Sequence, residues 1–371
     1  QEVVLAHGDA AQVISISGGA VVRIEDLRVN GGQDAVVDVD GEGTSLKLTD
    51  AMINCTAPED LTDEAAGHGL VATNGAQLTV NGGKVTGCAM YGVLVDSSKL
   101  VVDEMALISD HNGGGVRLEA ALPGSEIRTA TIENNLGFGV GLFCGELSII
   151  NSEITNTNNP GGGDGVVASI LADLPEGDPR IGCTTDLTVG GPGETQSNTI
   201  ESNQRAGVLI DGDVSALIQN NELNYNGNGG VWLVGASDSQ VSKTSVLENS
   251  VTENLHVGIG VVSHADATIA GNQVWDTLPI EDFSGETSHG DGIFVEEAVC
   301  EVYGNSLRRN VRYGILMREP EKGSCIGDDN TYEQNMQAHK WEHAQDKIDP
   351  CVQTWTPNVD DQKTAEKHCT Q

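Results

Sequence analysis

Residues 217–233, LIQNNELNYNGNGGVWL, carry a pattern that the chain repeats. The pattern is an aliphatic residue, two spacers, Asn, one spacer, an aliphatic residue, two spacers, Asn, three spacers, Gly and an apolar–any–apolar triplet. Several matches to so many fixed positions indicate an internal repeat, which has to be interpreted before anything else. The matching residues are Ile218, Asn221, Leu223, Asn226, Gly230, Val231 and Leu233, then Val246, Asn249, Val251, Asn254, Gly258, Ile259 and Val261, then Val302, Asn305, Leu307, Asn310, Gly314, Ile315 and Met317.

The spacing of the repeat excludes helical units. Short runs within each unit alternate apolar and polar residues, which predicts strands, whereas a helical hairpin repeat needs about 33–34 residues. A leucine-rich repeat has a similar length, but its L-x-x-L-x-L-x-x-N pattern does not match the paired Asn before Gly. The base period is 22–23 residues with longer steps at insertions, as counted from Gly69, Gly92, Gly115, Gly139, Gly165, Gly207, Gly230, Gly258, Gly292 and Gly314.

Short strands with one turn of the chain per unit predict an all-β fold, a parallel β-solenoid. Equivalent residues of successive coils then stack about 4.8 Å apart. We expect the aliphatic positions to form ladders inside the solenoid and the Asn positions to form hydrogen-bonded ladders at a bend. The Gly of each unit is expected to allow a sharp corner.

The chain resembles the right-handed parallel β-helix proteins of the pectin-lyase-like superfamily. The resemblance rests on the Asn–Gly repeats and on NTIESNQRAGVLI at 198–210, and it covers roughly 35–335. It implies a right-handed parallel β-helix of about twelve coils. It implies no single activity, because the superfamily includes lyases, hydrolases, epimerases, phage tailspikes, adhesins and non-catalytic surface proteins.

The repeat also suggests how the chain is organised. Residues 1–34 are expected to form degenerate first coils, residues 35–335 the β-helix, and residues 336–371 a C-terminal cap and tail. A short helix is expected in MQAHKWEHAQDKI at 336–348, with Trp341 facing the open end of the solenoid, and another in the insertion APEDLTDEAA.

The net charge restricts the classes of partner that the chain can bind. The net charge of −36, from 55 acidic against 19 basic residues, repels nucleic acid and anionic membranes. It also repels acidic polysaccharides unless cations bridge the two. No stretch is long enough to span a membrane, and the sequence begins like a mature or trimmed chain. Asp38, Asp40 and Glu42 resemble part of a calcium loop, so calcium is a candidate ligand, but an exposed acidic turn explains them as well.

The chain has eight cysteines. The repeat places three pairs on neighbouring coils, within reach of a disulfide, and leaves Cys351 and Cys369 for each other. Four disulfides would imply export to the periplasm, the cell surface or the medium, and the alternative is reduced cysteines in the core. The predicted pairs are Cys55–Cys88, Cys144–Cys183, Cys300–Cys325 and Cys351–Cys369.

One outward-facing row of residues is a candidate binding surface. It is unusually apolar, so either loops or a partner cover it, or Trp232 and Phe294 are platforms for sugar rings. The row is the middle residue of each apolar triplet, namely Leu94, Arg117, Gly141, Val167, Leu209, Trp232, Gly260, Phe294 and Leu316.

Charged residues cluster beside that row. Two carboxylates could hydrolyse a glycosidic bond, and a carboxylate with Arg could perform β-elimination. SHGDGIF at 288–294 weakly resembles a strand of the polygalacturonase group, but the other signatures of that group are absent, and a ladder of salt bridges explains the same residues. His111 is expected to be a corner residue. The candidates are Asp291, Glu296 and Arg318 for catalysis and Trp232, Phe294, Arg312 and His264 for binding, with Glu297 and His289 nearby.

These observations favour an exported, non-catalytic β-helix that binds a polysaccharide or a cell-surface protein, or acts as a rigid structural module. The alternative is a polysaccharide lyase, glycoside hydrolase or epimerase that acts on the outer face. The enzyme hypothesis requires its charged groups to converge in an open cleft beside Trp232 or Phe294.

Overall fold

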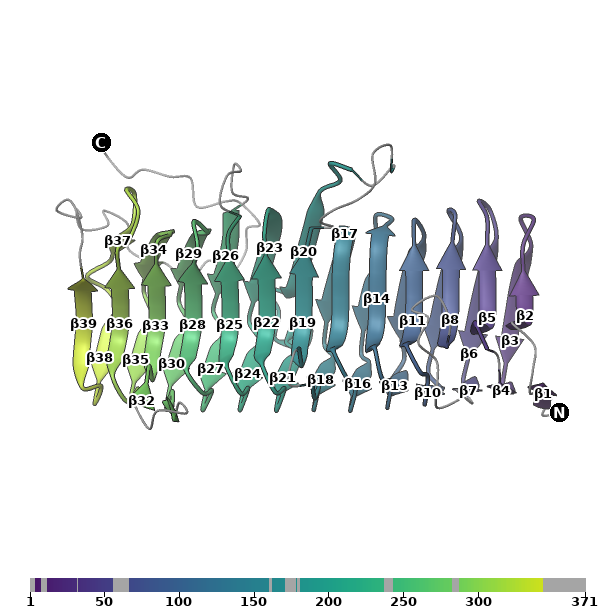
Figure 1. Cartoon of the computed structure of the whole chain (residues 1–371), viewed down its shortest axis with the longest axis horizontal. Helices are drawn as coiled ribbons and strands as arrows, with labels where there is room; N and C mark the ends of the chain where they lie inside the picture. Colours follow the sequence, from purple (N-terminus) through teal and green to yellow (C-terminus); the bar gives the residue numbers. More distant parts are fainter. Residues whose placement is uncertain are drawn as a thin grey trace. The chain divides into compact units, whose positions relative to one another are not determined.

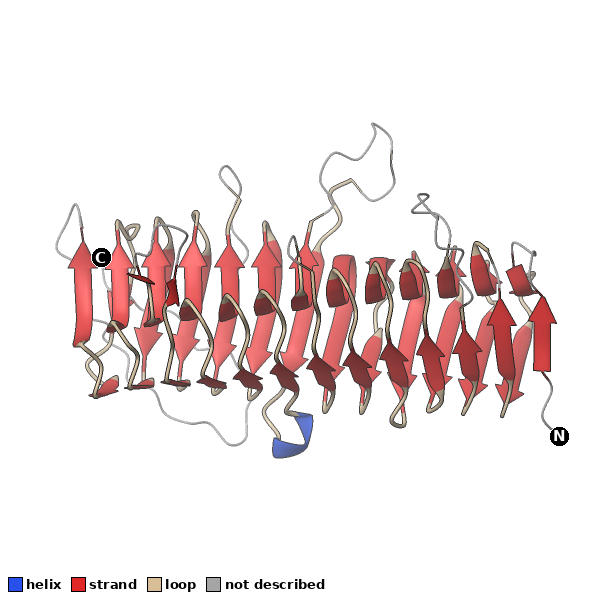
Figure 2. Ribbon diagram, turned by 60° about the horizontal axis from the view of Figure 1, so that its bottom comes forward, coloured by secondary structure: helices blue, strands red, loops and turns tan. Residues whose placement is uncertain are grey.

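The computed structural model describes residues 4–7, 12–31, 33–55, 67–159, 162–170, 178, 181–236, 243–281 and 287–342. The chain divides into two compact units, Gln1–Leu187 and Thr188–Gln371. Within each unit, every coil contributes strands that pair in parallel with the equivalent strands of neighbouring coils (Figure 1). The one helix in the described ranges is a short 3-10 turn, η1 (Glu194–Gln196) (Figure 2). The predicted all-β parallel solenoid is therefore confirmed.

The strands of unit 1 form three faces, which we call face 1, face 2 and face 3 in chain order. Face 1 contains β1 (Val4–His7), β4 (Arg28–Gly31), β7 (Met52–Asn54), β10 (Lys84–Thr86), β13 (Leu107–Ser109), β16 (Thr131–Glu133) and β18 (Glu153–Thr155). Face 2 contains β2 (Gln12–Ile16), β5 (Ala35–Asp40), β8 (His68–Thr73), β11 (Tyr91–Asp96), β14 (Gly114–Ala121), the first part of β17 (Phe138–Ile150) and β19 (Asp164–Ser169). Face 3 contains β3 (Val21–Glu25), β6 (Ser45–Thr49), β9 (Gln77–Asn81), β12 (Lys99–Asp103), β15 (Glu126–Arg128) and the end of β17.

Unit 2 has the same three faces, and β20 (Thr185–Gly190) lies where the chain passes from one unit to the next. Face 1 contains β21 (Thr199–Glu201), β24 (Glu222–Asn224), β27 (Ser250–Thr252), β30 (Gln273–Trp275), β35 (Ser306–Arg308) and β38 (Thr331–Glu333). Face 2 contains β22 (Ala206–Asp211), β25 (Gly229–Val234), β28 (Val257–Val262), β33 (Asp291–Glu296), β36 (Tyr313–Arg318) and β39 (Gln337–Glu342). Face 3 contains β23 (Val214–Gln219), β26 (Lys243–Leu247), β29 (Asp266–Ala270), β34 (Val299–Tyr303) and β37 (Cys325–Ile326). The antiparallel pair β31 (Ile280–Glu281) and β32 (Thr287–Ser288) leaves the solenoid between β30 and β33.

Aliphatic ladders fill the interior of each unit, as the repeat predicted. Each buried Val, Leu or Ile contributes about 1.5–3 kcal/mol relative to an exposed side chain, so the fold is stabilised coil by coil. One ladder of unit 1 is Val37, Leu70, Val93, Val116, Val140 and Val166. The equivalent ladder of unit 2 is Val208, Val231, Ile259, Ile293 and Ile315.

Buried Asn ladders follow two corners of unit 2. In the first, Asn221 Nδ2 donates to Asn249 Oδ1 at 3.0 Å, and the backbone N–H of Asn221 donates to the same oxygen at 2.9 Å. Each side chain thus satisfies polar groups that the corner would otherwise bury without partners. The residue before most of the ladder Asn residues has a left-handed backbone, for example Asn220 with φ 58°. The ladders are Asn198, Asn221, Asn249, Asn272, Asn305 and Asn330, and, with Thr277 in place of one Asn, Asn203, Asn226, Asn254, Asn310 and Asn335.

The Gly of each repeat has a different role from the one expected. Gly258 does not lie in the left-handed region, but a Cβ atom there would be 2.3 Å from Val274 Cγ1 and 2.5 Å from the carbonyl oxygen of Gly292. Gly230 is equally confined by Val251 and by the carbonyl of the next coil. Glycine is therefore required because the coils approach closely at this point, and the expectation of a sharp glycine corner was wrong.

Two of the predicted disulfides are confirmed. Cys55–Cys88 and Cys144–Cys183 are both bonded in unit 1. The predicted Cys300–Cys325 pair is wrong, because Cys300 is a free, buried thiol and Cys325 is bonded to another cysteine.

The register explains the error. Cys325 pairs with Glu301 and not with Cys300, whereas Tyr332 does pair with Leu307, so one extra residue lies between β37 and β38. A slip of one residue moves a side chain to the opposite side of a strand. The predicted Cys351–Cys369 pair lies outside the described residues.

The expectations for the ends and insertions have mixed outcomes. Residues 337–342 were expected to be helical, but they form β39, which pairs in parallel with β36 and so continues face 2. The remainder of the expected cap and the insertion expected as a second helix lie outside the described residues. At the N-terminus, β2 and β3 already pair with the coil that follows. No helix in the described ranges is long and apolar enough to cross a bilayer.

Candidate functional site

The apolar row lies on face 2 in the predicted register. In unit 2, Leu209 pairs with Trp232, Trp232 with Gly260, Gly260 with Phe294 and Phe294 with Leu316. Phe294 and Leu316 are only 2% and 1% exposed, and they form a buried cluster with Val257. Phe294 is therefore no open platform for a sugar ring, although it occupies the predicted outward position.

Trp232 is a half-buried member of the row. Its Nε1 donates to the backbone oxygen of Asn228 at 2.8 Å, and a Cβ at Gly260 would be 2.6 Å from its ring. The glycine therefore lets the indole lie flat against face 2. Because Asn228 and Gly260 already hold the ring, Trp232 would lose little conformational entropy on contacting a ligand, which suits an aromatic binding residue.

Asp291 begins β33 and is completely buried. Arg312 holds it with two hydrogen bonds, Nε to Oδ1 at 2.8 Å and Nη2 to Oδ2, and the backbone N–H of Tyr313 donates to Oδ1 at 3.2 Å. Burial alone would raise the pKa of Asp291, but hydrogen bonds from Arg312 and His289 outweigh it and hold the pKa below its ordinary value. Asp291 is thus a buried, charged structural acceptor at neutral pH.

Two histidines extend this cluster toward Trp232. His289 Nδ1 lies 3.1 Å from Arg312 Nη2 and 3.6 Å from Asp291 Oδ2. The ring of His256 contacts that of His289 edge to face, with centroids 4.1 Å apart, and lies 5.7 Å from Trp232. Burial is the main cause that lowers the pKa of His256 to about 4, so this imidazole is uncharged at neutral pH.

The other predicted charged residues are also paired. Arg318 Nη1 lies 3.0 Å from Glu296 Oε1 on the neighbouring strand, and the guanidinium lies over the ring of Phe294 at 5.5 Å. His264 pairs through Nδ1 with Glu321, away from the Asp291 cluster. Glu297 has a left-handed backbone at the turn that follows β33, and its oxygen accepts from His264 N at 2.5 Å. The salt-bridge ladder predicted as the alternative is therefore present on this part of face 2.

The geometry separates the two candidate catalytic carboxylates. Asp291 and Glu296 occupy opposite ends of β33, which at about 3.3 Å per residue puts their Cα atoms about 16 Å apart. Glycoside hydrolases hold their two carboxyl groups about 5–10 Å apart. Arg312 and Arg318 further hold each carboxylate in place. Asp291 and Glu296 therefore do not converge as a catalytic pair.

The weak calcium motif is not assembled into a metal site. Asp40 Oδ1 instead accepts hydrogen bonds from Thr73 and Asn74 of the next coil, at 2.9 and 2.7 Å. Burial, and then the charge of Asp40, raise the pKa of Asp38. Across the described ranges, no three His, Cys, Asp or Glu side chains are placed to share a metal ion.

Sequence reasoning missed His256 and an aromatic stack in unit 1. His68 stacks on Tyr91 at 5.4 Å, and Tyr91 stacks on Phe138 at 5.8 Å. Arg117 lies over the rings of Tyr91 and Phe143 and donates to the Tyr91 hydroxyl at 2.7 Å. A signal was available, because His68, Tyr91 and Phe138 all directly precede the Gly of a repeat, as Asp291 and Tyr313 do.

Comparisons with known proteins agree with this architecture. The chain is similar in structure to the Dettilon tailspike protein gp208, with a TM-score of 0.52 and 15% identity over 83% of this chain, but it spans only 61% of that chain. It is also similar to the A-module of mannuronan C-5 epimerase AlgE6 from Azotobacter vinelandii, with a TM-score of 0.52 and 13% identity over 91% of this chain and 87% of that one. No curated protein matches the sequence.

At such low identity these two similarities show the fold alone. The sequence itself matches the model of a protein family described as "Right handed beta helix region" over residues 12–169 and 189–348. This match covers most of the chain and agrees with the parallel coils, the aliphatic ladders and the repeat. The chain therefore belongs to the right-handed β-helix family.

Proposed function

We propose that this chain is an exported, non-catalytic β-helix that binds a glycan on face 2 of unit 2, beside Trp232. The observation that carries the proposal is the pairing of Asp291 with Arg312 and of Glu296 with Arg318. A general acid or base must be able to exchange a proton with a substrate. A buried carboxylate held by two arginine hydrogen bonds is poorly suited to that task.

Export is supported by the cysteines. Cys55–Cys88 and Cys144–Cys183 are disulfides, and disulfides persist mainly in secreted, periplasmic and cell-surface proteins. The strongly acidic composition also suits a protein that does not bind nucleic acid or insert into anionic membranes.

The charge pattern favours an uncharged glycan. Arg308, Arg309, Arg312 and Arg318 all form ion pairs with carboxylates of unit 2. A uronate would have to compete with these carboxylates and to approach a chain of net charge −36. A neutral polysaccharide avoids both costs, whereas an acidic one would need calcium or another cation as a bridge.

A binding screen tests the proposal. Neutral and acidic polysaccharides would be titrated into the full chain, with and without calcium, by calorimetry. We expect a neutral glycan to bind, and Trp232→Ala to weaken that binding at least tenfold. The matched control is Tyr225→Ala, which removes an exposed aromatic side chain in the turn after β24 and should leave the affinity unchanged.

The other outcomes have definite meanings. Failure of every glycan to bind would reject the proposal and leave a protein partner or a rigid structural role. Binding of acidic glycans alone, without calcium, would overturn the charge argument. Because one structural neighbour is named as a mannuronan epimerase, mannuronan belongs among the acidic glycans tested.

A further inference from the structure

The chain leaves the solenoid after Leu278 and returns to it at Gly290, between β30 and β33, and both ends of this excursion contact one residue, His256. The backbone N–H of His256 donates to the Leu278 oxygen at 2.7 Å, and the Gly290 N–H donates to the His256 oxygen at 2.7 Å. His256 also has a left-handed backbone, with φ 71°. A non-glycine residue in a rarely used conformation therefore contacts both the entry and the exit of the excursion. Leu278 N also donates to the Asn254 oxygen and Arg312 N to the Gly290 oxygen, both at 3.0 Å.

The side chain of His256 is held in its uncharged form. Nδ1 lies 2.8 Å from Asn228 Oδ1, and an amide oxygen can only accept, so Nδ1 carries the proton in this arrangement. Nε2 then has a free electron pair. It is buried and has no hydrogen-bond partner within the described residues. The one site at which His256 can take up a second proton is thus a place that offers the new N–H no acceptor.

Two of the three charged or titratable groups around His256 oppose a second proton as well. The charged or titratable groups that face His256 are His289, Asp291 and Arg312. Arg312 is a permanent cation, and Asp291, the one carboxylate among the three, is already committed to two hydrogen bonds from Arg312. Burial, and then the charges of His289 and Arg312, lower the pKa of His256 to about 4, although the carboxylate of Asp291 acts in the opposite direction. A protonated His256 therefore has to leave its contacts with His289 and Trp232 to be solvated.

We propose that His256 is an acid-sensitive clamp, which holds the two ends of the 278–290 excursion at neutral pH and releases them when its imidazole is protonated. The coupling is direct, because the ring that leaves its packed position belongs to the residue whose backbone makes both end contacts. The proposal concerns Leu278, Gly290 and His256 themselves, and it does not depend on the glycan proposal.

Hydrogen exchange measured by mass spectrometry tests the clamp in the full chain. Protection of the His256 and Gly290 amides would be compared at pH 7 and pH 4, after correction for the intrinsic exchange rates. We expect at least a tenfold loss of protection at pH 4, while peptides from β21 and β24 in the same unit keep theirs.

Two variants distinguish the effect of protonating His256 from the effect of low pH on the rest of the chain. His256→Asn removes the titrating group, and Asn tolerates a left-handed backbone, so its protection at these amides should not depend on pH. His264→Asn is the matched control, since His264 also has a left-handed backbone, φ 67°, and pairs elsewhere with Glu321. This control should lose protection as the wild-type chain does.

Two results would overturn the proposal. One is unchanged protection in the wild-type chain between pH 7 and pH 4, and the other is a loss at pH 4 that persists in His256→Asn. If His256→Asn also loses protection in β21 and β24 at pH 7, the variant is misfolded, and an NMR titration of the wild-type chain decides. The midpoint of the opening must then coincide with the protonation of His256, and a different midpoint rejects the clamp.

Discussion

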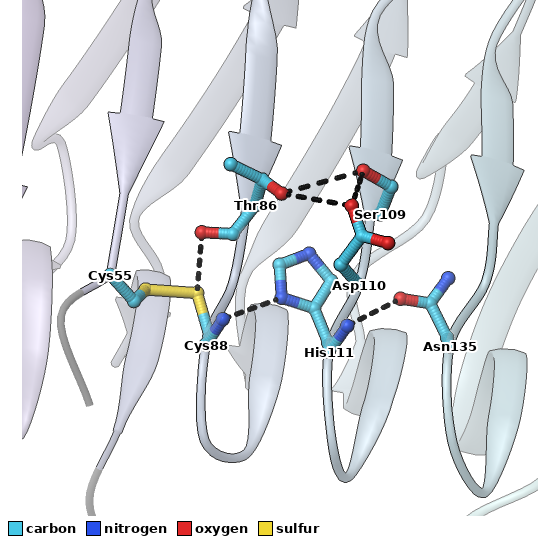
Figure 3. The surroundings of a disulfide bond; sticks show 7 residues. All are labelled: Cys55, Thr86, Cys88, Ser109, Asp110, His111 and Asn135. Carbon is cyan, nitrogen blue, oxygen red and sulfur yellow. Dashed lines mark hydrogen bonds between the residues drawn. A yellow bond between two sulfur atoms is a disulfide. The ribbon is translucent and has the colours of Figure 1, made fainter. Parts of the chain in front are cut away.

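Replacing His111 by Asn should make the stability of unit 1 less sensitive to acid. His111 is fully buried in a corner ladder, between Cys88 and Asn135. Its Nδ1 accepts from Cys88 N at 3.1 Å, and its own backbone N–H donates to Asn135 Oδ1 at 3.1 Å (Figure 3). His111 thus does the work that Asn does in the next coil, but with a group that can be protonated.

The size of the effect follows from the pKa. Burial lowers the pKa of His111 from 6.5 to about 4. Between those values the unfolded chain binds a proton at His111 that the folded chain does not. The part of the unfolding free energy that depends on neutral His111 is therefore fully present above pH 6.5 and is lost as the pH falls toward 4. At about 1.36 kcal/mol per pH unit, the loss is roughly 3 kcal/mol. Asn at this position cannot be protonated and keeps the acceptor that Cys88 N requires.

The assay is urea unfolding of both proteins at several pH values between 7.5 and 4, followed by far-UV circular dichroism. The other titrating groups cancel in the difference between wild type and His111→Asn. We expect that difference to shift by roughly 3 kcal/mol in favour of the variant as the pH falls from 7 to 4. A difference that stays constant with pH would refute the reasoning, because it would mean that His111 titrates alike in the folded and unfolded chain.

Three further predictions concern other buried groups. Arg312→Ala should destabilise unit 2 by about 3–5 kcal/mol in urea unfolding, because it leaves the buried Asp291 carboxylate without its cation. Arg309→Ala, at an exposed ion pair, should have a much smaller effect in the same assay. Gly258→Ala should cost at least about 1–3 kcal/mol by the same assay, since its Cβ would collide with the next coil. Cys300 should resist alkylation by iodoacetamide in the native chain and react after denaturation without reductant, as peptide mapping can check; burial raises the pKa of this thiol.

The coil architecture could be predicted because each coil repeats the same few contacts. The spacing of Asn221, Asn226 and Gly230 sets the period, and parallel stacking then places equivalent residues side by side. The same logic predicted the Cys55–Cys88 and Cys144–Cys183 disulfides. It failed at Cys325, because one extra residue in a turn changes the register without changing the repeat on either side.

The candidate site was harder to predict because its properties depend on contacts between segments that the repeat does not relate. Periodicity placed Phe294 on the outer side of face 2 but could not show that it is buried. It grouped Asp291 with Glu296, yet the structure separates them along β33 and pairs each with an arginine. His256 gave no signal of its own, since its importance comes from the excursion that returns to it.

A glycan-turnover assay tests the central claim, that the protein binds glycan without catalysis, most directly. The full chain would be incubated with neutral and acidic polysaccharides, including mannuronan, with and without calcium. Chromatography and absorbance would then detect shortened or unsaturated products, and NMR would detect epimerised residues. We expect a bound glycan to be recovered unchanged. Release of products or epimerisation that Glu296→Gln or Arg318→Ala abolishes would contradict the account and identify the Glu296–Arg318 pair as an active site.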